Sequence, residues 1–474
     1  MPELTYREPE PIRLPTPGRA MRTRRMARSL AAAARHFAPM AARKVARRPQ
    51  VQRPAAHALR RMFEDLGATY VKFGQAVASS PAVIPESIAE EFRSCLDSGP
   101  AVPFRQVRAV VEADLGMSLE TAFAEFSRKP VAAASIAVVH RARLHDGSEV
   151  AVKVLRPGIA EVVASDLDLM EPLFRILARQ GVEPAYNAVG YLIGLREQIA
   201  EELDLRNEVR TMAYFRELFA RFGLLRLVIP RVEERLCGPN VLTMEFMVGA
   251  PIDDLANVEK LGHNPAPLVA ELLQAWLLTA LRAGVFHADI HAGNLFLLDD
   301  GRLAMLDWGI VARLDADGQD LFRAIVRCAL GEEAAWDDVT AHTLRAQKAL
   351  LQDGFGYSYE DVRDMVRLFM EPVLTKPLKD VSMAALFMSP EQAAKVNHGV
   401  DLPQRSLMEH MRRNRAIAKA FRRAMDGGTL ESPFNRSTFL SAKQLLYLER
   451  YGRMYLPDRA LLADHDFLRA ALAG

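Results

Sequence analysis

The chain has 474 residues, half of them hydrophobic and a quarter charged, which is enough for a two-lobed enzyme or two to three globular domains. No run of about 18 uncharged apolar residues occurs, so no membrane-spanning helix is predicted, and the N-terminus lacks the apolar core of a secretory signal. Three widely spaced cysteines, Cys95, Cys237 and Cys328, form neither a metal pattern nor a disulfide framework, which favours a reducing, cytoplasmic environment.

The net charge of +2 conceals a strongly basic N-terminal arm. Residues 1–61 contain fifteen Lys and Arg but only three acids, so by difference the rest of the chain carries −10. We expect this arm to be partly disordered with short basic helices, because prolines interrupt it. An anionic membrane surface is its possible partner, which would make the protein peripheral to a membrane; an organelle transit peptide is an alternative. Nucleic acid is not expected as a partner, because the arm has almost no interleaved aromatic residues.

The pattern that follows the arm predicts three further regions. Apolar residues at helical spacing predict a helical extension over residues 62–128. Residues 129–250 then read as a small lobe, in which an Asp-Gly turn joins two strands and is followed by helices and a further strand. Residues 251–474 read as a large helical lobe that carries a small hairpin. The predicted elements of these lobes are strands over residues 135–143, 149–155, 241–246, 295–298 and 303–306, and helices over 160–179, 191–222 and 268–283.

The strongest chemical pattern is a set of carboxylates and an amide in the predicted large lobe. Asp289 is followed five positions later by Asn294, and Asp307-Trp308-Gly309 comes directly after an apolar strand. Phosphoryl transfer needs such a set, because one carboxylate orients the attacking oxygen while an amide and a second carboxylate hold Mg²⁺ against the phosphates. The pattern therefore predicts Asp289 as the catalytic carboxylate, Asn294 and Asp307 as metal ligands, and ATP and Mg²⁺ as cofactors. Taken singly, these residues could be turn or strand-capping residues.

A lysine in an apolar strand gives the second element of the prediction. Lys153 would be costly to bury without anionic partners, so it indicates a contact with phosphates and a carboxylate, unless this face of the strand is solvated. Glu208, in the predicted helix over residues 191–222, is its candidate partner, since kinases pair a strand lysine with a helix glutamate. Together with the predicted elements, this favours an α+β, two-lobed protein-kinase-like fold with a helical N-terminal extension and a mostly helical C-terminal lobe.

Two weaker patterns accompany these residues. Glu245 and Met247 follow a strand where a kinase hinge would lie, so their backbone groups are predicted to bind adenine, although a plain core strand would look the same. His287 and His291 could be imagined as a metal pair, but no third ligand is apparent. We expect these histidines to shape the catalytic loop by hydrogen bonding instead.

Three further motifs resemble the UbiB/ADCK (AarF) family of atypical kinases. Lys72-Phe73-Gly74-Gln75 resembles its Lys-x-Gly-Gln signature. Glu202-Leu203-Asp204 resembles its Glu-x-Asp motif. The alanine-rich segment that resembles the family's replacement for a glycine-rich phosphate loop is Ala132-Ala133-Ala134-Ser135.

The resemblance implies roles for these motifs. The alanine-rich loop would contact the nucleotide, although Ala137 and Val138 stand where the family usually has Gly and Gln. Glu202 and Glu208, six positions apart on one predicted helix, would face different partners, with Glu202 facing Lys72 of an extension that lies over the active-site cleft. Lys72, Gln75, Glu202 and Asp204 would then be regulatory.

The leading hypothesis from the sequence is an atypical Mg-ATP-dependent kinase or ATPase of this type, with ordinary protein-kinase activity doubtful. The resemblance implies a role in isoprenoid-quinone or related lipid metabolism at a membrane, with lipid- or quinone-pathway proteins as partners. Two alternatives stay open: a small-molecule phosphotransferase, and a non-catalytic scaffold that binds nucleotide. The Lys72–Gln75 motif speaks against the first, and the complete set of polar site residues speaks against the second.

Overall fold

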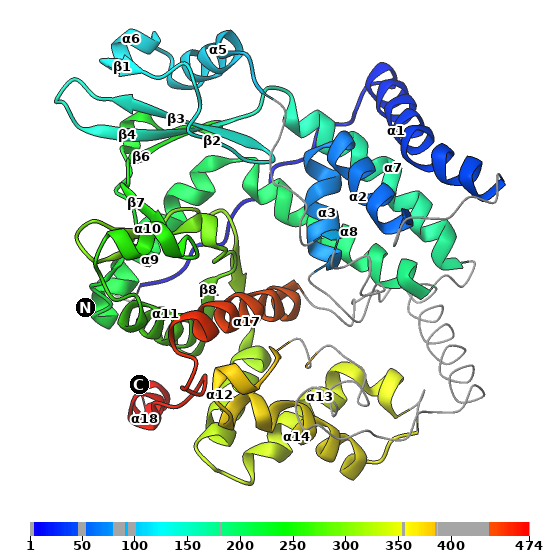
Figure 1. Ribbon diagram of the computed structural model, residues 1–474, viewed down its shortest axis with the longest axis vertical. Coiled ribbons are helices and arrows are strands. Elements are labelled where there is room, and N and C mark those ends of the chain that lie inside the picture. The colour runs from blue at the N-terminus through cyan, green and yellow to red at the C-terminus, as the bar shows by residue number, and fades with distance from the viewer. Residues whose placement is uncertain are drawn as a thin grey trace. The chain divides into compact units, whose positions relative to one another are not determined.

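The computed structural model describes residues 4–45, 54–78, 91–92, 101–179, 183–352, 356–383, 386 and 436–473. The chain forms two compact units, drawn in Figure 1. The N-terminal unit comprises Met1–Arg216 and Ile229–Met247, and the C-terminal unit comprises Glu217–Val228 and Val248–Gly474. Residues 217–228, expected in the small lobe, belong to the C-terminal unit because β5 (Leu227–Val228) pairs with β10 (Leu303–Met305).

The N-terminal unit contains an antiparallel sheet in the order β1-β3-β4-β6. β1 pairs with the C-terminal end of β3, at Ala142 and Arg143, and β2 pairs nearer its N-terminal end, at Val138 and Val139. The hairpin between β3 and β4 follows the predicted Asp-Gly turn, where Gly147 adopts a positive φ of 91° that suits glycine. The strands of this sheet are β1 (Glu125–Phe126), β2 (Ala132–Ala133), β3 (Ala137–Arg143), β4 (Glu149–Leu155) and β6 (Val241–Glu245).

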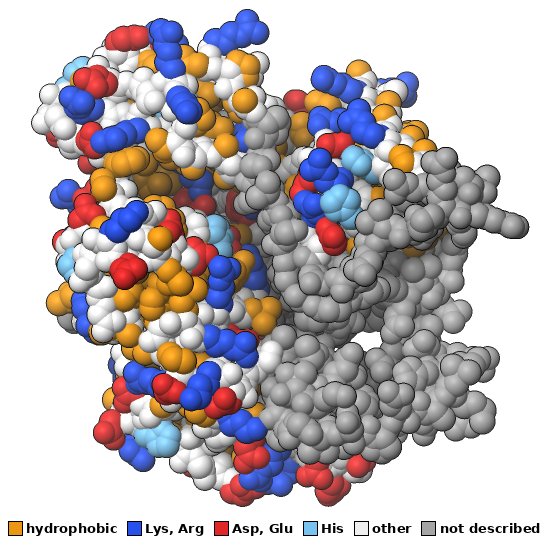
Figure 2. All heavy atoms as spheres, in the orientation of Figure 1, with side chains coloured by type: hydrophobic (Ala, Val, Ile, Leu, Met, Phe, Trp, Pro, Cys, Tyr) orange, Lys and Arg blue, Asp and Glu red, His pale blue; other side chains and the backbone are white. Residues whose placement is uncertain are grey.

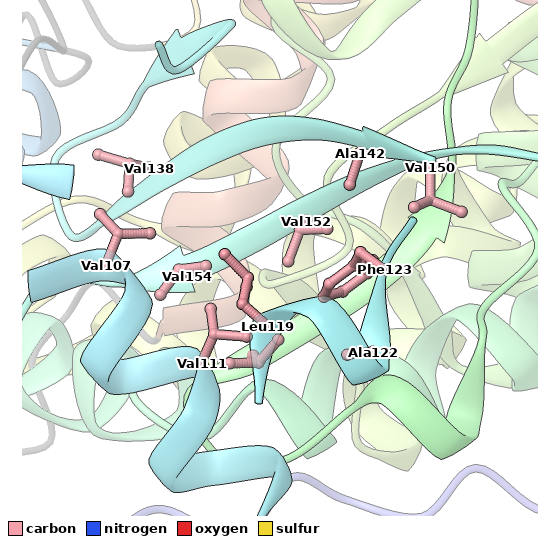
Figure 3. Close-up of a cluster of buried hydrophobic side chains, with 11 residues drawn as sticks. Val107, Val111, Leu119, Ala122, Phe123, Val138, Ala142, Val150, Val152 and Val154 are labelled. Carbon is pink, nitrogen blue, oxygen red and sulfur yellow. The ribbon is translucent and has the colours of Figure 1, made fainter. Parts of the chain in front are cut away.

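Two helices, α5 (Phe104–Leu115) and α6 (Leu119–Ala122), cover one face of this sheet. Figure 3 shows Val107 and Val111 of α5 directed at the strands, where they meet Val152 and Val154 of β4. All four side chains are buried, and burying one such side chain contributes about 1.5–3 kcal/mol. This core holds β4 in place, and β4 carries Lys153.

The remaining helices of the N-terminal unit pack on one another. α1 contacts α2 and α7, and α3 contacts α7 and α8. These helices are α1 (Arg19–Val45), α2 (Pro54–Leu66), α3 (Ala68–Ala78), α7 (Ile159–Arg179), α8 (Glu183–Glu202) and α9 (Leu205–Phe222).

The prediction of one continuous helix over residues 191–222 is wrong, because the structure has two helices there. α8 ends at Glu202, and α9 begins at Leu205. The break falls at Asp204, whose carboxylate accepts hydrogen bonds from the backbone and the side chain of Arg206. Aspartate favours helix starts for this reason, because its side chain competes for backbone N–H groups.

The basic arm contains a helix longer than the short ones expected there. α1 has 27 residues, and its Arg25 lies against α7. The guanidinium of Arg25 donates two hydrogen bonds of 2.6 Å to Asp166 and one to the carbonyl of Leu66. The side chains of Arg25 and Asp166 are only 6% and 1% exposed. Burial raises the pKa of Asp166, and the hydrogen bonds and charge of Arg25 oppose that rise.

The C-terminal unit holds a four-stranded sheet in the order β5-β10-β9-β7 and a separate antiparallel pair, β8 with β11. Its strands besides β5 and β10 are β7 (Gly249–Pro251), β8 (Val285–His287), β9 (Leu295–Leu298) and β11 (Val311–Arg313). Its helices are α10 (Leu255–Lys260), α11 (Ala266–Leu278), α12 (Ala316–Ala329), α13 (Ala335–Leu351), α14 (Tyr359–Thr375), α17 (Arg436–Tyr455) and α18 (His465–Ala473). Within the described residues, none of the helices combines the length and apolar character needed to cross a membrane.

The first prediction concerns the buried ion pair of α1. Arg25→Ala should lower the free energy of unfolding by about 3–5 kcal/mol, because it leaves Asp166 buried without its charged partner. Urea denaturation of the full chain measures this effect.

Arg22→Ala is the matched control, because Arg22 of the same helix pairs with Asp168 of α7 at the surface, with side chains 48% and 32% exposed. Its loss should cost less than about 1 kcal/mol. Equal effects of the two variants would contradict the role given to the buried pair.

Candidate functional site

The N-terminal unit contributes a buried ion pair between a strand and a helix. Lys153 lies in β4, opposite Val139 of β3 and Leu242 of β6. Its ammonium donates to both carboxylate oxygens of Glu208 in α9, at 3.0 and 2.8 Å. The two residues are only 8% and 3% exposed. The structure therefore brings together the strand lysine and helix glutamate that the sequence paired.

The alanine-rich loop lies at the edge of the same sheet. Ala132 and Ala133 form β2, which pairs with Val139 and Val138 of β3. The carbonyl of Ala134, the next residue, accepts hydrogen bonds from Nε and Nη2 of Arg156 at 3.1 and 2.9 Å.

Arg156 follows β4 directly and is itself buried, as is Ser135 of the loop. The backbone N–H of Arg156 also donates to the carbonyl of Ile136. Arg156 therefore links the loop to the strand that carries Lys153, a function that the sequence motifs did not single out.

The predicted hinge residues lie at the end of β6. The backbone N–H of Glu245 donates to the carbonyl of Arg231 at 2.8 Å, and the N–H of Phe246 donates to Glu149. The backbone N–H of Glu245 is thus engaged within the protein. Met247 ends this part of the N-terminal unit, and adenine binding by the backbone of Glu245 and Met247 stays a prediction.

The Lys-x-Gly-Gln motif lies in α3. The Lys72 ammonium donates to Glu202, the last residue of α8, at 2.6 Å. A Cβ added to Gly74 would lie 2.4 Å from the ring of Phe92, so this packing requires glycine. Gln75 belongs to α3, but its side chain lies outside the described residues.

Asp204, the last member of the Glu-x-Asp motif, lies between α8 and α9 and contacts Arg206 in the first turn of α9. Its carboxylate binds the Arg206 guanidinium at 2.6–3.2 Å. Burial opposes ionisation, but the hydrogen bonds from Arg206 hold the pKa of Asp204 below its usual value. The two acids of the motif therefore have different partners: Glu202 contacts Lys72 of α3, and Asp204 binds Arg206 at the start of α9.

The C-terminal unit brings Asn294 and Asp307 together through the register of a hairpin. Leu295 of β9 pairs with Met305 of β10, so the residues just outside this pair are also neighbours. The N–H of Leu306 donates to the carbonyl of Asn294 at 2.9 Å. Asn294 and Asp307 are thus held at the same end of the hairpin, although thirteen positions separate them.

His287 joins the catalytic segment to the segment around Asp307. It ends β8, which pairs with β11, and its Nε2 contacts the carbonyl of Asp307 at 2.5 Å. Its Nδ1 accepts a hydrogen bond from the N–H of Asp289 at 3.1 Å. Both ring nitrogens are engaged, so His287 shapes the loop and is not a metal ligand. Burial lowers the pKa of His287, which keeps it neutral.

Trp308 occupies the aromatic position after Asp307. Its ring is 1% exposed and meets the ring of His287 edge-to-face at 4.5 Å, and its indole N–H donates to the carbonyl of Met305. The aromatic residue of this Asp-Trp-Gly segment is therefore a core residue that fixes the neighbouring acid. The N–H of Gly309 in turn donates to Oδ1 of Asp307 at 3.0 Å.

Asp289 lies between three groups of its own unit. The Asn294 side chain donates to its carbonyl at 3.0 Å, and the Lys443 ammonium of α17 donates to its Oδ1 at 2.5 Å. Nε2 of His291 lies 4.0 Å from Oδ2. Burial alone would raise the pKa of Asp289, but the positive charge of Lys443, aided by His291, holds it below its usual range. Asp289 is therefore ionised at neutral pH.

The donor set of Asn294 and Asp307 fits a Mg²⁺ ion that is also held by phosphates. The Asn294 side-chain nitrogen is bound to Asp289, which directs the amide group and leaves its oxygen as the ligand atom. Carboxylate and amide oxygens are the ligands that Mg²⁺ prefers. Within the described residues, no group of three or more His, Cys, Asp and Glu side chains is arranged to hold a metal alone. Such a site would need ligands from the substrate.

The fold is that of a protein-kinase-like protein, and comparison with known sequences gives the family. Residues 94–336, just over half the chain, match the model of the ABC1 atypical kinase-like domain. The chain belongs to this family of atypical kinase-like proteins. The predicted α+β kinase-like fold and the resemblance to UbiB and AarF proteins are thereby confirmed.

Two curated relatives agree with this assignment. An uncharacterized chloroplastic aarF domain-containing protein kinase from Arabidopsis thaliana is 31% identical over 411 residues, which cover 86% of this chain and 73% of that protein. A probable protein kinase UbiB from Marinobacter nauticus is 31% identical over 355 residues, covering 73% and 63%. A solved Mycobacterium tuberculosis protein in complex with erythromycin is 25% identical, with a TM-score of 0.46, and covers 84% of this chain and 94% of that one.

A second prediction tests the buried pair of the N-terminal unit without any ligand. Lys153→Met and Glu208→Leu should each lower the free energy of unfolding by about 3–5 kcal/mol, because each removes the charged partner of a buried group. Because the two side chains contact each other directly, the double variant should cost clearly less than the sum, as urea denaturation of all four proteins would show. Additive losses would contradict the direct coupling of the two residues.

Proposed function

We propose that this protein is an atypical kinase or ATPase that binds Mg-ATP and transfers its γ-phosphoryl group. The observation that carries the proposal is the convergence of Asp289, Asn294 and Asp307 on one hairpin end in the C-terminal unit. The buried pair of Lys153 and Glu208 supplies the matching lysine in the N-terminal unit. Membership of an atypical kinase-like family supports the same chemistry.

Each residue has a defined task in this reaction. The acceptor oxygen attacks the γ-phosphorus, the bond to the bridging oxygen of ADP breaks, and the acceptor proton passes to Asp289, which is ionised and so able to receive it. Lys153, oriented by both oxygens of Glu208, binds phosphate oxygens. Bound Mg²⁺ would neutralise phosphate charge, and Asn294 and Asp307 are the residues that would hold it.

The proposal also covers the biological role of the protein and its regulation. The UbiB name of several relatives supports a role in isoprenoid-quinone or related lipid metabolism. The Lys72–Glu202 pair anchors the extension on α8, and a change in this contact would be the regulatory step. A small-molecule phosphotransferase is less well supported, because such enzymes are not expected to carry the Lys72–Gln75 motif of α3.

The third prediction tests nucleotide binding and turnover separately. Wild-type protein should bind ADP with Mg²⁺ in calorimetry, and Asp307→Asn should weaken the Mg²⁺-dependent binding at least about tenfold, because a ligand charge is lost. Asp289→Asn should bind nucleotide like wild type but lose ATP hydrolysis by about 100-fold or more.

The outcomes separate the competing functions. Binding without any hydrolysis by the wild type would favour the nucleotide-binding scaffold. No binding of either nucleotide with Mg²⁺ would sink the proposal altogether.

We also propose that the arm contacts an anionic membrane surface. α1 carries exposed Arg19 and Arg24 beside the exposed apolar side chains of Met26 and Leu30. Figure 2 shows basic and apolar side chains side by side over α1 and its surroundings. Basic residues near an anionic surface contribute about 1 kcal/mol each, and apolar neighbours add insertion.

The fourth prediction follows from these arginines. Arg19→Gln/Arg24→Gln should weaken binding to phosphatidylserine-containing vesicles about tenfold or more in low salt, as vesicle sedimentation would show. These substitutions spare Arg25, whereas deletion of the arm would also break its buried pair. Arg345→Gln/Arg469→Gln, at exposed positions of the C-terminal unit, is the control. Equal binding by the two double variants would contradict the membrane role of α1.

A further inference from the structure

The C-terminal unit places a lysine from a distant helix directly on the reacting carboxylate. Lys443 lies in α17, more than 150 positions after Asp289, and its ammonium contacts Oδ1 of Asp289 at 2.5 Å. Both side chains are 19% exposed, so solvent and small ligands still reach the pair. Lys443 also lies 5.8 Å from the ring centre of Tyr447, one turn further along the helix.

The helix that carries Lys443 is fixed to the catalytic loop by two more contacts. Both backbone groups of Ile290, the residue after Asp289, are bound by α17. Its N–H donates to the side-chain oxygen of Gln444 at 3.1 Å, and its carbonyl accepts from the Tyr451 hydroxyl at 2.8 Å. Gln444 and Tyr451 are fully buried. These contacts hold the Lys443 backbone in register with Asp289, as expected for a group with a defined position.

The same helix also packs against β11, the strand that follows the Asp307 segment. α17 contacts β11, the partner strand of β8, and contacts α11 as well. The position of Lys443 is thus set by the fold of the C-terminal unit and not by a flexible side chain that reaches across the surface.

Lys443 engages one oxygen of Asp289 and leaves room for a second contact at the other. A carboxylate has about four lone-pair positions, so an ammonium on Oδ1 does not prevent Oδ2 from accepting a hydroxyl proton. In the described part of the chain, the group that approaches Oδ2 is Nε2 of His291, at 4.0 Å. Nδ1 of His291 accepts from the N–H of Gly293 at 3.1 Å, which orients the ring. The geometry therefore suits a carboxylate that is held in place and still accessible.

We propose that Lys443 is a positioning residue for phosphoryl transfer: it fixes the Asp289 carboxylate in its reactive orientation and supplies a positive charge beside the site of transfer. The inference rests on the proposed function. It assigns α17 a role in the chemical step in addition to its structural one. A fixed cation that needs no reorganisation stabilises charge that moves during a reaction, which is the source of its effect on rate.

The role differs from that of a residue needed only for folding. A positioning cation should change the rate of the chemical step while nucleotide affinity stays the same, because Lys443 contacts the carboxylate of Asp289, the proposed proton acceptor. A second cation of suitable length should replace it. A purely structural residue would alter stability and binding together and would not be rescued by charge.

The test compares three variants of the full chain with wild type. Lys443→Met should lower the single-turnover rate of ATP hydrolysis about 100-fold, with the Kd for Mg-ADP unchanged within about twofold. Lys443→Arg should recover most of that rate, because it restores a cation. Arg450→Gln removes a cation from the same helix, where it pairs with Asp253 at the surface, and should leave the rate at the wild-type value.

A wild-type rate in Lys443→Met would overturn the inference while the proposed function stands. So would equal losses in Lys443→Met and Lys443→Arg accompanied by a lowered Tm, since these indicate a structural role. If Lys443→Met does not fold, Lys443→Gln takes its place, with the same expectation and the same contradiction. Failure of the wild type itself to bind Mg-ADP or to hydrolyse ATP would overturn the proposed function, and this inference with it.

Discussion

The buried ammonium of Lys153 is the constraint on which the N-terminal unit depends. A charge inside a sheet is tolerated only with a partner, and Glu208 provides one by binding Lys153 with both oxygens. This pair fixes α9 against β4. The break at Asp204 then lets Glu202 end a different helix, where it meets Lys72. Two ion pairs therefore attach the two helices: Lys153–Glu208 joins α9 to β4, and Lys72–Glu202 joins α8 to α3.

Similar ion pairs join the helices α7, α8 and α9 to other elements. α7, α8 and α9 each contribute one acid that receives a cation from another element: Asp166 receives Arg25 of α1, Glu202 receives Lys72 of α3, and Glu208 receives Lys153 of β4. The arm, the extension and the strand that carries Lys153 are each attached through an ion pair. Such pairs are specific because an unpaired member would remain buried and charged, so each attachment favours one arrangement.

The chemical half-site of the C-terminal unit depends instead on backbone register. The pairing of Leu295 with Met305 places an amide and a carboxylate at one end of a hairpin, and His287 connects them to the catalytic loop. The positive charge of Lys443 keeps Asp289 ionised in spite of burial. Hydrogen bonds and packing thus hold Asp289, Asn294 and Asp307 in defined positions within the C-terminal unit.

Sequence spacing was enough to predict those parts of the fold and site that are local. The β3–β4 hairpin follows from its Asp-Gly turn, and the approach of Asn294 to Asp307 follows from two short strands around a turn. The continuous helix predicted over residues 191–222 failed because apolar periodicity persists through Asp204, while its side chain caps a new helix. Lys443 and Arg25 could not be recognised, since their partners lie more than 140 positions away and no local pattern encodes such a contact.

The central proposal is that Lys153, Asp289, Asn294 and Asp307 are the residues that bind and use Mg-ATP. A crystal structure of the wild-type protein with a non-hydrolysable ATP analogue and Mg²⁺ tests it most directly. The account predicts the metal on Asn294 and Asp307 and a phosphate oxygen within hydrogen-bonding distance of Lys153. A nucleotide bound without contact to Lys153, or a metal bound without Asp307, would contradict it.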